Sequence, residues 1–127
     1  MNVPDHLRYT RDHEWVEMVD GKVRMGVTDY AQDALGDVVF VQVPTVGVTV
    51  QVGTTFSEVE STKSVSDIYG PIDGTVTEVN GALTDSPQRI NEDPYGEGWI
   101  CVIQAADDPN LDHLLDAPAY KDLVGEV

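Results

Sequence analysis

Apolar and polar residues alternate through most of the chain, and this is the pattern of strands that bury one face. Two alternating runs, 15–19 and 22–27, flank an Asp20-Gly21 pair. Asp-Gly favours the turns that match the twist of antiparallel strands, so the segment predicts a β-hairpin. Alternation or a short apolar run marks six further expected strands: 38–43, 48–52, 54–60, 64–68, 75–79 and 99–104.

A short segment between the strands favours a helix instead. Thr28 is a suitable N-cap and Gly36 a suitable stop, so the sequence predicts a helix between them. One helical turn is also expected at 87–91. The apolar side of the first helix is expected to consist of Ala31, Ala34 and Leu35.

The last 21 residues, 107–127, change from the strand period to the helix period. Pro118 lies between two apolar groups, so we expect two short helices separated at that proline. No linker divides the chain, and we expect one domain over 1–127, with a core at about 9–104 and a helical extension at about 107–124. The apolar groups at helical spacing are Leu111, Leu114 and Leu115, then Tyr120, Leu123 and Val124.

Composition limits the partners. The 127 residues contain 7 Lys and Arg and 23 Asp and Glu, which gives a net charge of −16. Such a chain repels nucleic acid and anionic membrane surfaces, whose phosphates require basic residues, and it favours basic protein partners. The hydrophobic content of 41% is that of a folded domain, so the charge does not indicate disorder.

The usual signatures of catalysis and metal binding are missing from the sequence. There is no nucleophile elbow, phosphate loop or dinucleotide fingerprint, and the three histidines are far apart. We therefore expect no catalytic residue and no metal site. Cys101, the single cysteine, lies in an apolar run, which favours a buried thiol. No 18-residue apolar run and no signal or transit pattern is visible, so we expect a cytoplasmic protein.

One lysine stands apart from the acidic background. Between Arg24 and Arg89 the only cation is Lys63, whereas the same stretch holds nine acids. Lys63 lies between two expected strands, so it should occupy a hairpin tip, and the small residues Thr62 and Ser64 flank it. A solvated surface charge is one interpretation. The other is an amine that an enzyme recognises and acylates.

The residues around this lysine resemble the lipoyl-attachment region of lipoyl domains, and the wider chain is similar to the glycine cleavage system H protein family. The resemblance extends from about Tyr9 to Val124. Around the lysine it rests on residues 59–67 and 71–74. Elsewhere it rests on Tyr9-Thr10, His13-Glu14-Trp15, and the segments 26–32, 35–41 and 91–99.

The resemblance implies a mainly β fold, the barrel-sandwich hybrid of lipoyl domains, with two small antiparallel sheets, short helices and a C-terminal helical extension. It also implies that Lys63 carries lipoate in amide linkage. Related biotin carriers have Met on both sides of the target lysine, whereas Thr62 and Ser64 occupy those positions here and favour lipoate.

The function implied by the resemblance is carriage without catalysis, by a monomer. A glycine decarboxylase that uses pyridoxal phosphate would load the aminomethyl group, and an aminomethyltransferase would pass the one-carbon unit to tetrahydrofolate. A dihydrolipoyl dehydrogenase with FAD and NAD would reoxidise the arm, and lipoyl-attaching enzymes would be further partners. The alternative is a lipoyl relay that donates lipoyl groups to other apo-proteins.

Two carboxylates match family positions near a cleft for the loaded arm. They are Glu14, in the His13-Glu14-Trp15 motif, and Asp67, four residues after the lysine. Each is expected to hold the aminomethyl ammonium by a charge-assisted hydrogen bond, or else to be an ordinary acid at a strand edge. Asp12 and Ala34, in neighbouring motifs, depart from the family pattern and so affect the polar lining expected for this cleft.

Overall fold

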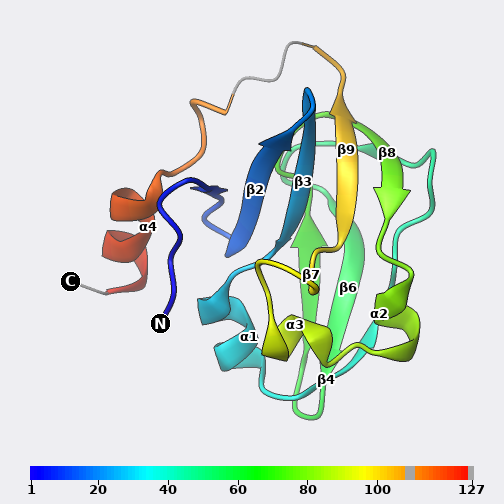
Figure 1. Cartoon of the computed structure of the whole chain (residues 1–127), viewed down its shortest axis with the longest axis vertical. Helices are drawn as coiled ribbons and strands as arrows, with labels where there is room; N and C mark the ends of the chain where they lie inside the picture. Colours follow the sequence, from blue (N-terminus) through cyan, green and yellow to red (C-terminus); the bar gives the residue numbers. More distant parts are fainter. Residues whose placement is uncertain (108–110, 126–127) are drawn as a thin grey trace.

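The computed structural model describes residues 1–107 and 111–125. Its strands form two antiparallel sheets, with short helices at one end and a C-terminal helix against the larger sheet (Figure 1). The six-stranded sheet has the order β1 (Arg8–Tyr9), β2 (Glu14–Val19), β3 (Lys22–Val27), β9 (Cys101–Ala105), β8 (Gly74–Val79) and β5 (Thr49–Val50). The three-stranded sheet has the order β4 (Val38–Val41), β6 (Thr55–Ser61) and β7 (Val65–Tyr69). The expected mainly β fold is confirmed.

The β2–β3 hairpin forms where the alternation predicts it. Val19 pairs with Lys22 across the turn. Asp20 and Gly21 both have positive φ, 52° and 78°, which is the conformation of a primed turn. The strong twist of this turn carries β3 back beside β2 and aligns the buried faces of both strands.

Helix α1 (Asp29–Leu35) is also confirmed, with one correction. The Thr28 hydroxyl accepts a hydrogen bond from the Ala31 N–H at 3.1 Å, and Gly36 ends the helix with φ 81°. Leu35 is buried, but Ala34 is exposed, so its placement on the apolar side was wrong. Each helical residue turns the side chain by roughly 100°, and Ala34 is turned away from the face that Leu35 and Ala31 share.

The observed strands lie where the sequence predicts them, but some are shorter than expected. The expected strand 38–43 stops at Val41 and contains a bulge between Val38 and Phe40, while 48–52 contracts to β5. The expected turn at 87–91 is α3 (Arg89–Glu92), and an unexpected turn, α2 (Ala82–Asp85), precedes it. Both are single turns that connect β8 to β9 at the end of the molecule where α1 lies (Figure 1).

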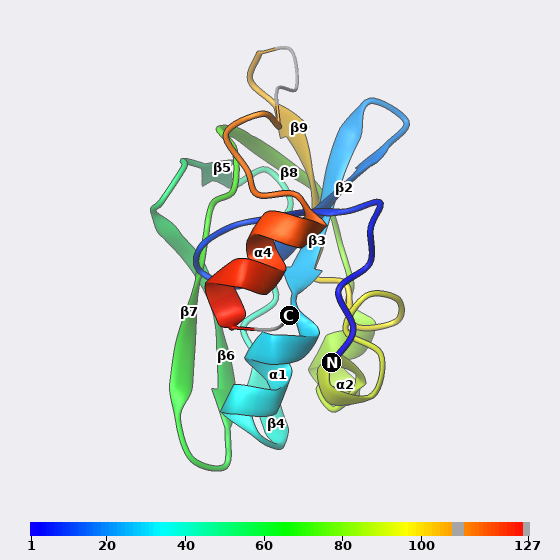
Figure 2. The same cartoon turned by 90° about the vertical axis from the view of Figure 1, so that its left-hand side faces the viewer.

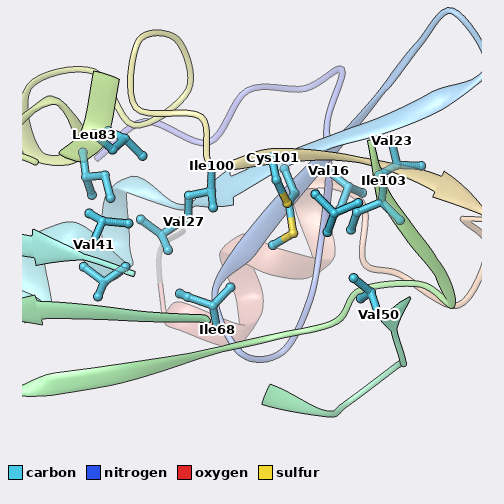
Figure 3. Close-up of a cluster of buried hydrophobic side chains, with 14 of the residues drawn as sticks. Val16, Val23, Val27, Val41, Val50, Ile68, Leu83, Ile100, Cys101 and Ile103 are labelled. Carbon is cyan, nitrogen blue, oxygen red and sulfur yellow. The ribbon is translucent and has the colours of Figure 1, made fainter. Parts of the chain in front are cut away.

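The main core lies between the two sheets. Figure 3 shows side chains from both sheets converging, among them Val16 and Ile103 from the larger sheet and Val41 and Ile68 from the smaller one. Cys101 belongs to this core, and burial raises the pKa of its thiol to about 12. The thiol is therefore inert at neutral pH, as a buried cysteine should be.

The described residues of the tail contain one helix, and the prediction that Pro118 separates two helices was wrong. Helix α4 (Ala117–Val124) contains Pro118 in its first turn, where the missing N–H costs no hydrogen bond. Asp116 caps the helix by accepting from the Ala119 N–H at 3.0 Å. The expected earlier helix falls partly on residues 108–110, outside the described residues, and 111–116 contains turns and an antiparallel bridge of Leu115 to Tyr9.

A second cluster attaches α4 to the larger sheet. The rings of Tyr9 and Tyr120 stack with centroids 4.6 Å apart. The Tyr120 hydroxyl lies 2.7 Å from Thr28 Oγ1 and 2.8 Å from His13 Nδ1. Figure 2 shows α4 directly above α1. The hydrogen bond between Tyr120 and Thr28 therefore joins α4 to the N-cap of α1. The buried members of this cluster are Val3, Leu7, Tyr9, Trp15, Ala117 and Tyr120.

Candidate functional site

Lys63 occupies the tip of the β6–β7 hairpin, which projects beyond the helices at one end of the molecule (Figure 2). Glu60 and Val65 are the last paired residues, so the turn consists of residues 61–64. The Ser61 N–H donates to the Ser64 carbonyl at 2.8 Å. Ser61 Oγ accepts from the N–H groups of Lys63 and Ser64 at 3.2 Å and 3.1 Å. One serine hydroxyl therefore organises the turn that presents the lysine.

The loop after α1, at Gly36 and Asp37, contacts the turn at Thr62 and Lys63. The Thr62 N–H donates to the Asp37 carbonyl at 3.0 Å. The stem of Lys63 lies over Gly36, where a Cβ added to the glycine would come within 3.3 Å of Lys63 Cε. Gly36 thus serves twice, because its positive φ ends α1 and its missing side chain leaves room for the lysine stem.

Asn91 holds this loop in place, and sequence reasoning did not single it out. Its Nδ2 donates to the Gly36 carbonyl at 2.8 Å, and its Oδ1 accepts from the Val38 N–H at 2.8 Å. Asn91 therefore fixes the loop on which Lys63 rests. The residue begins the 91–99 motif, but nothing in the sequence shows that it reaches a loop 55 positions away.

The Lys63 ammonium is accessible. The side chain is exposed, and within residues 1–107 and 111–125 it forms no salt bridge. Thr62 and Ser64 are exposed as well. An enzyme can therefore approach the amine without displacing a partner side chain, and small neighbours leave that approach open.

Glu14 is a buried acid at the start of β2, unlike the exposed Asp67. Its side chain is enclosed, with the residue 1% exposed. Oε1 accepts from the Thr10 hydroxyl at 2.9 Å, and Oε2 accepts from the Tyr69 N–H at 2.8 Å. Burial raises the pKa of this carboxyl to about 7, and the two hydrogen bonds oppose the rise. Near neutral pH the group changes charge readily.

The stability of the protein should show this raised pKa. Between pH 4.5 and 7 the folded chain keeps a proton on Glu14 that the unfolded chain has lost, so this group reduces the free energy of unfolding as the pH rises. Glu14→Gln removes that slope. Relative to the parent, the variant should gain about 2–3 kcal/mol between pH 4.5 and pH 7.5, measured by urea unfolding. The exposed Glu78→Gln is the control, and an equal gain in it would contradict the assignment.

Asp67 has a different environment from Glu14. It is exposed on β7 and directly opposite Glu58 of β6. In the described part of the chain no hydrogen bond joins Asp67 to Glu14. The two carboxylates are nevertheless linked through β7, because Glu14 binds the backbone of Tyr69, two residues beyond Asp67. The two residues that depart from the family pattern, Asp12 and Ala34, are both exposed.

Within residues 1–107 and 111–125, no three His, Cys, Asp or Glu side chains are grouped as metal ligands. None of the described helices has the length and apolar character needed to span a membrane. Among the described residues, the lysine hairpin and the buried acid Glu14 are the features that carry candidate chemistry.

Comparison with known proteins identifies the family. A family model described as glycine cleavage H-protein matches residues 7–127. A glycine cleavage system H protein of Coprothermobacter proteolyticus is 52% identical over 127 residues, covering 99% of this chain and 100% of that protein. One of Mycobacterium tuberculosis is 54% identical over 132 residues, covering 98% of each. The crystal structure of a glycine cleavage system H protein from Mycobacterium marinum superposes with a TM-score of 0.89 at 45% identity, covering 97% of this chain and 99% of that one.

Two antiparallel sheets with an exposed lysine at a hairpin tip define a carrier protein of lipoyl-domain architecture. The chain belongs to the glycine cleavage H-protein family. Its role is that of a carrier within the glycine cleavage system, whose other components are its partners.

Proposed function

We propose that this single domain carries lipoate in amide linkage on Lys63. In this role it shuttles the aminomethyl group from the glycine decarboxylase to the aminomethyltransferase, and reducing equivalents to dihydrolipoyl dehydrogenase. The observation that carries the proposal is the exposed lysine at the end of an ordered hairpin, in a chain of this family. The chain itself performs no catalysis in this proposal.

The residues around Lys63 fit a lipoyl group. The turn is held by Ser61 and by Asp37, so the acylated side chain would extend from a fixed origin. When bound, the group supplies a reducible disulfide at the end of a flexible chain. The tether raises the effective concentration of that disulfide near a docked partner. The surrounding acids steer basic partners and permit release, because such contacts are screened by salt.

Glu14 is proposed as the docking group for the loaded arm, with Asp67 as a second contact. Glu14 accepts a hydrogen bond from the Tyr69 N–H, at the far end of β7 from the lysine turn. The strand from Ser64 to Tyr69 spans roughly 17 Å. An acylated Lys63 side chain must cover this distance to reach the Glu14 carboxylate. The carboxylate is buried, so its hydrogen bond to an ammonium would be strengthened by the low local dielectric. Asp67 lies on β7 between the lysine and this carboxylate, and its exposure suits a transient contact.

Reconstitution tests the proposal. The purified chain, lipoylated and incubated with glycine, should release no carbon dioxide above the rate of free lipoamide, and adding the decarboxylase should start turnover. Glycine turnover by the chain alone would contradict the carrier assignment. A chain that fails with the decarboxylase but passes lipoyl groups to an apo-protein would instead support the relay. The intact mass of the protein from its native host shows directly whether Lys63 is lipoylated.

A further inference from the structure

The outward side of the three-stranded sheet adjoins the lysine turn and is unusual in composition. Phe40 of β4, Glu60 of β6 and Val65 of β7 are paired across the sheet in one row, next to the turn. Phe40 is 50% exposed and Val65 58% exposed. We call this surface the outer face, and its members are Val39, Phe40, Glu58, Glu60, Val65 and Asp67.

A bulge in β4 creates the apolar part of the outer face. In a regular strand successive side chains point to opposite sides, so Val39 and Phe40 could not both point outward. The register shifts between Val38 and Phe40, and as a result Val39 is 52% exposed beside the exposed Phe40. The flanking residues Val38 and Val41 are buried. Bulges often re-aim side chains toward a functional surface, and exposed apolar side chains beside the lysine mark a contact area.

The next row of the outer face is acidic and electrostatically unfavourable. Glu58 pairs directly with Asp67 across β6 and β7, and like charges directly opposite each other destabilise a sheet. Glu60 adds a third acid between Phe40 and Val65. Among the described residues from 25 to 88, Lys63 is the only Lys or Arg, so no other basic residue of this stretch offsets these acids. A basic partner surface would relieve the repulsion.

We propose that the outer face is the docking surface for the enzyme that acylates Lys63, and that this enzyme presents an apolar contact ringed by Lys and Arg. This inference rests on the proposed lipoylation of Lys63. Before acylation the amine has only its own four-carbon stem, so the enzyme must contact residues that adjoin the turn. After acylation the added chain extends the reactive group away from the turn. Enzymes that act on the end of that chain therefore do not need to contact the outer face.

The reaction at this surface is acyl transfer from an activated lipoyl group, such as a lipoyl adenylate formed from lipoate and ATP. The deprotonated Nζ of Lys63 attacks the carbonyl carbon and forms the amide bond. The bond from that carbon to the phosphate oxygen breaks, AMP leaves with the electron pair, and one proton passes from Nζ to solvent. The outer face takes no part in this chemistry, and its residues act through docking alone.

The test compares acylation rates of apo variants with a purified lipoate–protein ligase, lipoate and ATP, followed by intact mass. The Phe40→Ser/Val65→Ser double variant should have a kcat/KM at least tenfold below the parent, mainly through a raised KM, and weaker direct binding to the ligase. Its melting temperature should stay close to that of the parent, because both side chains are already half exposed. Glu58→Gln/Glu60→Gln should reduce the salt dependence of kcat/KM.

Two controls match these variants. Val46→Ser removes a valine that is 55% exposed. Val46 lies in a loop beside the larger sheet, where the N–H of the next residue, Gly47, donates to the Val76 carbonyl. Glu78→Gln removes an exposed acid from β8. Both should be acylated at the parent rate. Equal rates for parent and Phe40→Ser/Val65→Ser would overturn the docking proposal, as would a defect seen only with the glycine decarboxylase. A parent chain that is not acylated at all would instead refute lipoylation of Lys63.

Discussion

Lys63→Arg is expected to abolish lipoylation completely while leaving the fold unchanged. Arginine keeps the positive charge and a long stem, but its guanidinium does not become a nucleophilic amine at physiological pH. The Lys63 side chain is exposed and has no salt bridge within residues 1–107 and 111–125, so its replacement removes no folded-state contact of consequence. Intact mass after incubation with ligase, lipoate and ATP should show the lipoyl increment in the parent and none in the variant.

Two other lysines supply matched controls for that experiment. Lys22 follows the β2–β3 turn and Lys121 lies in α4. Lys22→Arg and Lys121→Arg should both be lipoylated like the parent. A full lipoyl increment on Lys63→Arg would show that another amine is the target, and would refute the site. Of these three variants, Lys63→Arg should lose glycine turnover with the decarboxylase, and the other two should keep it.

Gly74→Ala is expected to destabilise the protein by about 3 kcal/mol or more. Gly74 pairs with Val50 on one side and Ala105 on the other. A Cβ on it would lie 2.2 Å from the Gln104 carbonyl oxygen and 2.8 Å from Ile103 Cγ2. Because the nearest atom belongs to the backbone, β8 and β9 must separate to accommodate the methyl group. Urea unfolding of parent and variant measures the loss.

Gly81→Ala is the matched control for this glycine. Gly81 has φ −62°, and nothing lies within 4 Å of a Cβ added to it. Alanine there should leave stability unchanged or raise it by about 0.5 kcal/mol, through a less flexible unfolded chain. If Gly74→Ala unfolds within about 0.5 kcal/mol of the parent, the close approach of β8 and β9 does not constrain this position.

The lysine hairpin could be predicted from the sequence because its determinants are local. Two short alternating runs separated by small polar residues predict a tip at Lys63, and Ser61 forms that turn with residues only two and three positions away. The turn of Asp20 and Gly21 was predictable for the same reason. In the tail, Pro118 does mark a helix boundary, but it begins α4 and does not separate two helices. Proline is excluded from the interior of a helix but favoured in its first turn, and choosing between these requires knowing where the helix begins.

Other parts of the site depend on contacts between distant segments. Nothing local to Glu14 shows that its carboxylate is buried and bonded to the Tyr69 N–H, 55 positions away. Asn91 likewise reaches the Gly36 loop only in the folded chain. The apolar residues of the expected strand 38–43 do not show that Val39 and Phe40 are both exposed, since the bulge arises from pairing with β6.

Residue type and neighbours a few positions apart are enough to specify the strand pattern, the acidic charge, the exposed lysine at a hairpin tip and the family resemblance. Contacts between distant segments are needed to specify which acid is buried, which loop supports the lysine and which apolar side chains face outward. Burial and the pKa of Glu14 depend on packing between sheets, and pairing register depends on partners 20 positions away, as for Phe40 and Glu60. Short-range alternation carries no information about such partners.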